Sequence, residues 1–233
     1  VPLVSNVCNI RMVPLAIDIV TSELTGRPSP VPGLKEKNIP YYGVKESVFP
    51  FNMFQEVDPV LGPEMRSTGE VLGLSEFYGE AFFKAQEATQ TKLPMSGTVL
   101  ISVCDKDKAE LPEVAKGFAD AGFHILATKG TQKVLADAGI VSEFVYKLSE
   151  GRPNISDLIT NGKIDLIINT PRGADGTLDD SYLRKAAIRK KIPYITTMAA
   201  AKATASGIES MNKPGCGVVR SLQELHSTIT DKE

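Results

Sequence analysis

The stretch TVLISVCDKDKAELPEVAKGFADAGFHILATKGT, residues 98–131, decides the fold of the second half of the chain. It holds two short apolar runs, at 98–103 and 123–127, that are typical of strands buried on both faces. Between them lie apolar residues spaced as on one face of a helix: Leu111, Val114, Ala115, Phe118 and Ala119. A strand, a helix and a second strand in this order predict two parallel strands joined by a crossover helix.

The same alternation continues toward the C-terminus. Strand-like runs at 144–148, 164–168 and 194–197 are separated by helical patterns, and further helices are expected at 199–211 and 222–229. Strands that alternate with helices predict a parallel sheet covered on both faces, and the right-handed crossover rule favours a doubly wound order. The expected fold class is therefore α/β, with a doubly wound five-stranded parallel sheet.

The first part of the chain has a different texture, rich in proline and loop residues. It predicts a helix at 13–24 that stops at Gly26, a strand at 41–51 and a helix at 76–88, which together make an α+β unit. Thr89–Gly97 shows no periodicity and predicts a linker. The expected organisation is a first part at 1–88, a linker at 89–97 and an α/β domain at 98–233.

Composition excludes several classes of protein. The chain has 233 residues, 42% of them hydrophobic, and a net charge of −2, so no strong basic field invites nucleic acid or an anionic membrane. The three cysteines, Cys8, Cys104 and Cys216, form no Cys-x-x-Cys pair, and with only two histidines we expect no metal site. We expect reduced thiols and a cytoplasmic protein. Because the chain starts at Val1 without methionine, we interpret it as a piece of a longer protein.

Polar residues follow four of the five expected strands. Because the carboxyl ends of parallel strands meet at one edge of a sheet, near helix N-termini, we expect these side chains to converge there. Hydroxyls, an amide, a glycine and lysines together suit a phosphate group. The predicted phosphate-binding residues are Ser102, Lys108, Thr128, Lys129, Gly130, Thr131, Lys147, Asn169 and Thr170.

Simpler roles compete for each of these residues taken alone. Thr128 and Thr131 fit helix N-caps, Gly130 fits a turn, and Lys108 and Lys147 fit solvated surface charges. The upstream glycine of a Walker loop is missing, so nucleotide triphosphate hydrolysis is not predicted. No catalytic constellation is visible either, and we predict a binding site without catalytic residues.

Several segments resemble one family. VDPVLGPEMRSTGEV at 57–71 and YYGVKE at 41–46 closely resemble the end of the second ATP-grasp unit in the carbamoyl-phosphate synthase large subunit. ATKGT at 127–131, EGRP at 150–153 and IINT at 167–170 resemble its methylglyoxal-synthase-like regulatory domain. The resemblance covers essentially the whole chain, in the same order as in the family.

The resemblance implies that the parent protein is a ligase that makes carbamoyl phosphate from bicarbonate, ammonia taken from glutamine, and two ATP, for pyrimidine and arginine biosynthesis. It implies ATP, Mg²⁺ or Mn²⁺ and K⁺ for the parent, with the metal ligands upstream of Val1 and no cofactor in this chain. The isolated chain is therefore expected to be inactive. Implied partners are the glutaminase small subunit and further copies of the large subunit.

The regulatory half implies an allosteric nucleotide site for UMP or IMP at Ser102, Lys108, Thr128, Thr131, Lys147 and Asn169. The sequence departs from the family at Pro171, where a hydroxyl residue is usual, and in a longer loop at 172–176, where Arg172 offers a replacement contact. Some members also bind ornithine, and the matching positions are Glu46, Asp180 and Thr196. Glu46 shares a period-2 face with apolar residues, so either a cationic ligand or a neighbouring arginine such as Arg66 is expected to neutralise it.

Two other functions remain open from the residues. A methylglyoxal synthase shares this fold and uses a catalytic aspartate, but Arg152 stands near that position and an arginine cannot act as a base. A structural or oligomerisation domain with a vestigial pocket is the third possibility, and Pro171 favours it.

Overall fold

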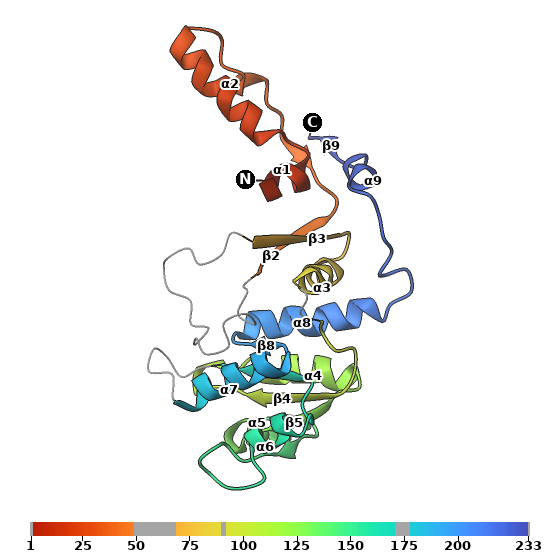
Figure 1. The fold of residues 1–233 in the computed structure, drawn as a ribbon. Coiled ribbons are helices and arrows are strands. Elements are labelled where there is room, and N and C mark those ends of the chain that lie inside the picture. The colour runs from red at the N-terminus through yellow and green to blue at the C-terminus, as the bar shows by residue number, and fades with distance from the viewer. Residues whose placement is uncertain (1, 49–68, 90–91, 171–177, 233) are drawn as a thin grey trace.

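The computed structural model describes residues 2–48, 69–89, 92–170 and 178–232. Its centre is a five-stranded sheet in the order β6-β5-β4-β7-β8, with every neighbouring pair parallel (Figure 1). The strands are β4 at Thr98–Ser102, β5 at His124–Ala127, β6 at Glu143–Phe144, β7 at Leu166–Asn169 and β8 at Tyr194–Ile195. The predicted α/β fold class is confirmed.

Helices cover both faces of this sheet. On β4, Val99 and Ile101 face one core and Leu100 faces the other, as the alternation of a strand requires. The first core is closed by α4 at Leu111–Asp120, α5 at Lys129–Asp137 and α8 at Met198–Met211. The second is closed by α6 at Ile155–Thr160 and α7 at Leu178–Lys190. Both faces of the sheet are therefore buried against helices, which explains the near-continuous apolar runs of its strands.

The strand order reverses between β4 and β7. From β4 the chain steps outward through β5 to β6, then returns to the other side of β4 for β7 and β8. The helices after β4 and β5 lie on one face, and those after β6 and β7 lie on the other. In open parallel sheets this reversal leaves a crevice beyond the carboxyl ends of the two central strands, where ligands bind.

Two expected strands end early. The run at 144–148 forms a strand only to Phe144, because the chain turns at Lys147: its backbone N–H donates to the Glu150 carboxylate at 3.2 Å and its carbonyl accepts from Glu150 N at 3.2 Å. The strand is therefore shorter than the predicted run at 144–148. The run at 194–197 ends at Ile195, since Thr197 caps α8 through a hydrogen bond from Ala200 N at 3.2 Å.

The first part of the chain builds a smaller unit. Its elements are α1 at Pro2–Cys8, α2 at Met12–Thr25, the 3₁₀ helix η1 at Val31–Gly33, β1 at Lys37–Asn38, β2 at Tyr42–Val48, β3 at Gly69–Ser75 and α3 at Tyr78–Ala88. α2 ends at Gly26 in the left-handed conformation (φ 68°), as predicted. β2 and β3 pair antiparallel, from Tyr42 opposite Ser75 to Val48 opposite Gly69. Leu93, within the expected linker, is buried in the first core.

The C-terminal end returns to this smaller unit (Figure 1). After α9 at Leu222–His226, β9 at Thr230–Asp231 pairs antiparallel with β1. Within the described ranges, no single helix is long and apolar enough to cross a membrane. Only α1 and α2 taken together have the length and apolar composition of a membrane span, and the two helices are bent by 107° relative to each other.

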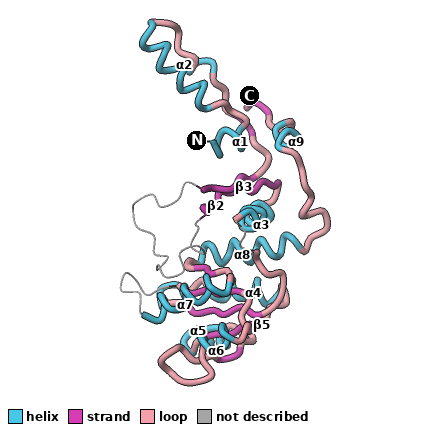
Figure 2. The backbone as a smooth tube through the Cα atoms, viewed as in Figure 1, coloured by secondary structure: helices cyan, strands magenta, loops and turns pink. Residues whose placement is uncertain are grey.

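α3 packs on α8 through small residues, and Figure 2 shows the two helices side by side between the β2–β3 pair and the five-stranded sheet. Gly79 of α3 lies against Ser206 and Ser210 of α8, and a Cβ on Gly79 would lie 2.5 Å from the backbone oxygen of Ser206. A Cβ on Gly207 would in turn lie 3.2 Å from the backbone oxygen of Gly79. Glycine is therefore required at position 79 for the two backbones to approach this closely.

We predict that Gly79→Ala lowers the free energy of unfolding by about 1 to 3 kcal/mol, because the new methyl group forces α3 away from α8. Gly33→Ala is the matched control, since nothing lies within 4 Å of its added Cβ, and it should change stability by less than about 0.5 kcal/mol. Urea denaturation of the three proteins measures both values. Equal stability of the two variants would contradict the packing argument.

Candidate functional site

Ser102 and Asn169 end the two central strands and are partners in the register of the sheet. The chain continues this pairing one residue further, because Thr170 N donates to the Ser102 carbonyl at 3.0 Å. Ser102 is half-buried and Asn169 is buried. The strand reversal thus brings these two predicted site residues directly together.

Two of the predicted site hydroxyls accept hydrogen bonds from backbone N–H groups. The Thr131 hydroxyl accepts from Val103 N at 3.1 Å, and the Thr170 hydroxyl accepts from Cys104 N at 3.0 Å. Both threonines are buried, with 1% and 5% of their surface exposed. They satisfy the N–H groups of the chain leaving β4, which would otherwise be unpaired in the core. A structural role therefore accounts for these two hydroxyls.

Thr128 behaves differently. It occupies the N-cap position of α5, yet its hydroxyl makes no capping hydrogen bond. The hydroxyl instead lies 3.3 Å from Ser102 Oγ and 3.3 Å from Thr131 Oγ1. The simpler role, in which the Thr128 side chain caps the helix, is therefore wrong. The first N–H groups of α5 are not capped by this hydroxyl, and such groups bind anions.

Lys108 lies over the start of α5. Its Nζ is 3.3 Å from the position of a Cβ on Gly130, and only 28% of its side chain is exposed. Asp105, three residues earlier, pairs with it at 2.6 Å between Oδ1 and Nζ. The surface-charge role proposed for Lys108 is therefore incomplete, because the ammonium group is directed at the predicted site. Lys129, the first residue of α5, is exposed.

Lys147 is not joined to this group by any contact. It lies half-buried in the turn after β6, and its ammonium group has no hydrogen bond or ion pair with the residues that the structure describes. Pro171 and the loop at 172–176 lie outside the described residues, so the departure from the family pattern there has no structural counterpart to report.

The Asn169 side chain links the site to α7 and β8. Its Nδ2 donates to Asp180 Oδ1 at 2.9 Å and to the Tyr194 hydroxyl at 2.7 Å. Because an ionised carboxylate only accepts, Asp180 fixes which way the amide points. Burial raises the pKa of Tyr194 to about 12, so this hydroxyl stays protonated at neutral pH.

The three positions expected for ornithine are not linked by contacts. Asp180 is held by Asn169, whereas Glu46 on β2 accepts from Gln86 Nε2 of α3 at 2.9 Å, and Thr196 is exposed before α8. No hydrogen bond or ion pair joins any two of the three within the described ranges. Glu46 does share its half-buried face with Val44 and Val48, as predicted. Arg66, its alternative partner, lies outside the described residues.

Sequence reasoning missed the carboxylates around the site. A hydrogen bond from the Cys104 thiol (Sγ to Oδ2, 3.1 Å) holds the pKa of Asp107 below its ordinary value, with smaller contributions from Thr170 and Lys106. Asp105 pairs with Lys108 across one turn of the 3₁₀ helix η3 at Asp105–Asp107. The spacing of three residues between Asp105 and Lys108 was the one signal in the sequence for that pair.

Arg152, near the catalytic position of a methylglyoxal synthase, is exposed, with its Nε 3.9 Å from Asp157 Oδ2. Asp157 is already engaged in the capping box of α6, where its carboxylate accepts from Asn154 N at 3.0 Å. Across the described ranges, no group of three or more His, Cys, Asp and Glu side chains is placed to hold a metal ion.

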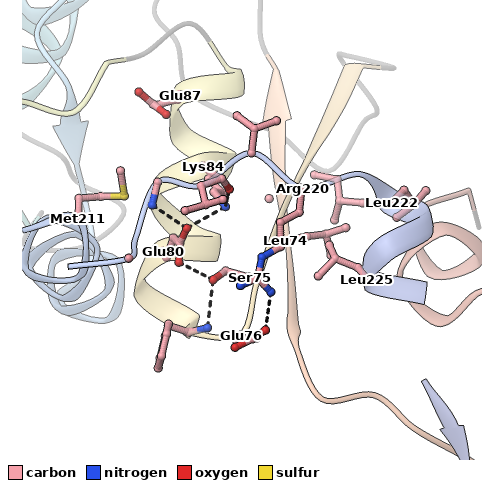
Figure 3. Close-up of a pocket in the computed structure, with 17 residues that line it drawn as sticks. Leu74, Ser75, Glu76, Glu80, Lys84, Glu87, Met211, Arg220, Leu222 and Leu225 are labelled. Atoms are coloured by element: carbon pink, nitrogen blue, oxygen red, sulfur yellow. Dashed lines mark hydrogen bonds and ion pairs between the residues drawn. The ribbon is translucent and has the colours of Figure 1, made fainter. Parts of the chain in front are cut away.

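A cavity of about 520 Å³ lies elsewhere, between β3, α3 and the C-terminal strap (residues 212–225), as Figure 3 shows. Its buried carboxylate, Glu80, accepts from Ser75 Oγ at 2.7 Å and from Gly217 N at 3.0 Å, and pairs with Lys84 at 2.8 Å. Burial acts to raise the pKa of Glu80, but the bonds from Lys84, Ser75 and Gly217 outweigh it and hold the pKa below its ordinary value.

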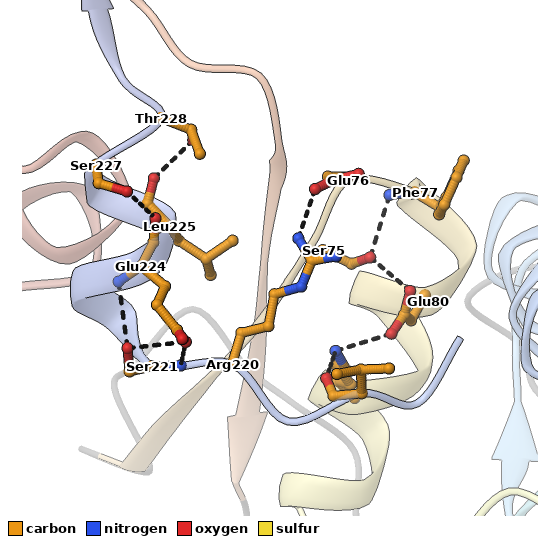
Figure 4. A network of polar contacts seen from close by, with 12 residues as sticks. Ser75, Glu76, Phe77, Glu80, Arg220, Ser221, Glu224, Leu225, Ser227 and Thr228 are labelled. Atoms are coloured by element: carbon orange, nitrogen blue, oxygen red, sulfur yellow. Dashed lines mark hydrogen bonds and ion pairs between the residues drawn. The ribbon is translucent and has the colours of Figure 1, made fainter. Parts of the chain in front are cut away.

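The same strap is held further along its length. Arg220 pairs with Glu76 beside α3, and Ser221 and Glu224 form the capping box of α9 (Figure 4). Because protein donors already satisfy Glu80, this cavity does not need a ligand to balance its charge. The carboxyl edge of the sheet, with uncapped helix N–H groups, two hydroxyls and an ammonium, remains the better site for an anion.

Comparison with known proteins agrees with this assignment of the fold. Residues 110–196 match the family model described as MGS-like domain. The chain is 54% identical over 187 residues to the carbamoyl phosphate synthase large chain of Acidobacterium capsulatum, covering 80% of this chain and 17% of that protein. It is 48% identical over 197 residues to the carbamoyl phosphate synthase large chain, C-terminal section, of Aquifex aeolicus, covering 83% of this chain and 36% of that section.

A third relative matches almost the whole chain. The carbamoyl phosphate synthase large chain of Archaeoglobus fulgidus is 44% identical over 228 residues, covering 97% of this chain and 21% of that protein. The chain thus spans between 17% and 36% of the length of these relatives. It contains an MGS-like domain and matches carbamoyl phosphate synthase large chains over most of its length, which confirms the resemblance seen in the sequence.

We predict that Thr131→Val lowers the free energy of unfolding by about 1 to 3 kcal/mol, because it leaves the buried Val103 N–H without a partner. Thr128→Val, the matched control of equal shape, should cost at most about 1 kcal/mol, since its hydroxyl contacts other hydroxyls and no backbone N–H. Urea denaturation measures the difference. Equal losses in the two variants would contradict the division between structural and available hydroxyls.

Proposed function

We propose that this chain is the effector-binding, C-terminal part of a carbamoyl phosphate synthase large chain, and that the carboxyl edge of its five-stranded sheet binds a nucleoside monophosphate. The observation that carries the proposal is the convergence of Ser102, Thr128 and Lys108 at the strand reversal. The matches to carbamoyl phosphate synthase large chains supply the biological context.

The phosphate would bind at the start of α5. Thr128 leaves the first N–H groups of that helix uncapped, and the positive end of the helix favours an anion. Lys108 supplies a full positive charge beside Gly130, where the missing side chain leaves room for close approach. Ser102 and Thr128 supply hydroxyl donors. The same groups fit the phosphate of UMP and that of IMP.

The nucleoside would extend along the crevice toward Asn169. Both amide protons of Asn169 are engaged by Asp180 and Tyr194, so its side-chain oxygen is the group left to meet a ligand. That oxygen accepts hydrogen bonds, and the hydroxyls of a ribose and the imino N–H of uracil or hypoxanthine are donors. Lys147 is included because the resemblance assigns it to the nucleotide site, and Asp180 reaches that site through its hydrogen bond from Asn169.

The parent protein is proposed to form carbamoyl phosphate from bicarbonate, ammonia and two ATP, with a glutaminase subunit as partner and with large chains associating further. ATP, Mg²⁺ or Mn²⁺ and K⁺ belong to its upstream part. Bound ornithine would meet Glu46, Asp180 and Thr196, and ornithine binding that Glu46→Gln leaves unchanged would contradict this placement.

A structural role with a vestigial pocket is the second candidate. It is favoured by Thr131 and Thr170, whose hydroxyls are used by the backbone of the chain leaving β4. Nucleotide titration separates the two functions, because a vestigial pocket releases no binding heat.

We predict measurable heat when UMP or IMP is titrated into the chain in a calorimeter. Lys108→Ala and Lys147→Ala should each weaken binding about tenfold or more, because a charge-assisted hydrogen bond is lost. Lys163→Ala removes an exposed lysine before β7, at the opposite edge of the sheet, and should leave binding unchanged. No heat with either nucleotide would contradict the proposed function.

We predict that the isolated chain forms no carbamoyl phosphate from ammonia, bicarbonate and ATP with Mg²⁺, because the resemblance assigns the ATP-binding residues and metal ligands of the parent protein to a part outside this chain. A complete large chain from a relative serves as the positive control in the same assay. Product formation by the isolated chain above the enzyme-free rate would overturn the expectation.

A further inference from the structure

The side chain of Asn169 lies on the face of the sheet that α6 and α7 cover. Side chains of a strand alternate between its two faces, and Ile167, two residues before Asn169, belongs to the second core. Ser102 has the same orientation, because Leu100, two residues before it, belongs to that core as well. The Asn169 side chain is therefore within reach of α7 and of β8, which lies next to β7.

Both protons of the Asn169 amide nitrogen are used within the protein. Nδ2 donates to Oδ1 of Asp180, on α7, at 2.9 Å and to the hydroxyl of Tyr194, on β8, at 2.7 Å. Asn169 is 5% exposed, so water competes little for these hydrogen bonds. Within the ranges that the structure describes, no donor is bonded to its side-chain oxygen. The amide therefore offers a bound molecule an acceptor and no donor.

The two partners of the amide have different effects on its direction. An ionised carboxylate only accepts hydrogen bonds, so Asp180 requires the nitrogen of the amide on its side. A tyrosine hydroxyl either donates or accepts, so Tyr194 alone would hold the amide in either direction. Asp180 therefore sets the direction of the Asn169 side chain, and Tyr194 anchors it.

The crevice consequently has two chemically different ends. The start of α5 offers donors, namely the Lys108 ammonium and the uncapped N–H groups of the helix. The other end offers the oxygen of Asn169, whose amide is bonded to the Asp180 carboxylate. Phosphate oxygens are negative acceptors, so they gain hydrogen bonds at α5 and none at Asn169. Asn169, although predicted as a phosphate-binding residue, is suited to a hydroxyl or N–H donor instead.

We propose that Asp180 and Tyr194 are positioning residues that set the specificity of the site, by holding the oxygen of Asn169 toward the bound ligand. The ligand class is then a phosphate monoester that carries a hydrogen-bond donor beyond its phosphate, either a ribose hydroxyl or the imino N–H of a base. The proposal rests on the proposed function, because it requires the phosphate to bind at the start of α5. Inorganic phosphate uses the α5 end alone and is indifferent to the direction of the amide.

The test compares nucleotide binding with phosphate binding in the same protein. UMP, IMP, ribose 5-phosphate and inorganic phosphate are titrated calorimetrically into the chain and into Asp180→Asn, and the affinity for each organic ligand is divided by that for inorganic phosphate. This ratio cancels the general gain in anion binding that follows the loss of a negative charge. Because an amide at position 180 accepts or donates, Asn169 loses its fixed direction and only part of the molecules present the oxygen. We expect the ratio for UMP and IMP to fall about two- to fivefold.

Two further variants and one ligand sharpen the comparison. Tyr194→Phe removes the anchor and keeps the carboxylate, so its ratio should fall by less than that of Asp180→Asn. Asp137→Asn is the matched control, since it removes the same charge from the exposed last residue of α5, and its ratio should stay unchanged. Ribose 5-phosphate identifies the donor: a fall like that of UMP assigns it to a ribose hydroxyl, and a fall confined to the nucleotides assigns it to the base.

The hydrogen bonds of the amide are tested without ligand as well. In NMR spectra of the unliganded chain, the side-chain amide protons of Asn169 should exchange with water more slowly than those of Asn161, an exposed asparagine after α6. Equal exchange at the two asparagines would overturn the fixed direction of the amide, whatever the calorimetry shows.

The outcomes separate the two proposals. If the chain binds UMP or IMP and the ratio is unchanged in Asp180→Asn, or falls equally in Asp137→Asn, the positioning role is overturned and the proposed function stands. A ratio that falls further in Tyr194→Phe than in Asp180→Asn would overturn the assignment of the direction to Asp180. If the chain and its variants bind none of the four ligands, the proposed function fails and the positioning role fails with it.

Discussion

The structure depends on the reversal of strand order between β4 and β7. Because β4 is central, its carboxyl end has β5 on one side and β7 on the other, and the helices that follow leave toward opposite faces. This places Ser102, Thr128 and Asn169 at one crevice although they lie far apart in the sequence. Buried threonines fix the chain that leaves β4, so the remaining hydroxyls and the start of α5 stay available to an anion.

The first part of the chain is joined to this domain by close packing. α8, which follows the last strand of the sheet, meets α3 at glycines and serines, and the C-terminal strap is tied to α3 through Glu80 and Glu76. A change at the carboxyl edge therefore has a short physical route through β8 and α8 to α3. That route is consistent with the effector-binding role proposed for the carboxyl edge.

Periodicity in the sequence predicted the parallel sheet, and the geometry of parallel strands predicted that the residues after β4, β5 and β7 converge. Neither the periodicity nor the strand geometry predicted the hydrogen-bond partners of individual side chains. Thr131 and Thr170 accept hydrogen bonds from backbone N–H groups of a distant segment, and Asp180 on α7 accepts one from Asn169 on β7. Each of these depends on tertiary placement, which local pattern does not encode.

The central claim is that the carboxyl edge of the sheet holds a nucleoside monophosphate. A crystal structure of the chain grown with UMP or IMP tests it most directly. The account predicts phosphate density at the start of α5, with oxygens about 3 Å from Lys108 Nζ and Thr128 Oγ1. A nucleotide bound in the cavity beneath the C-terminal strap, with the carboxyl edge empty, would contradict the account.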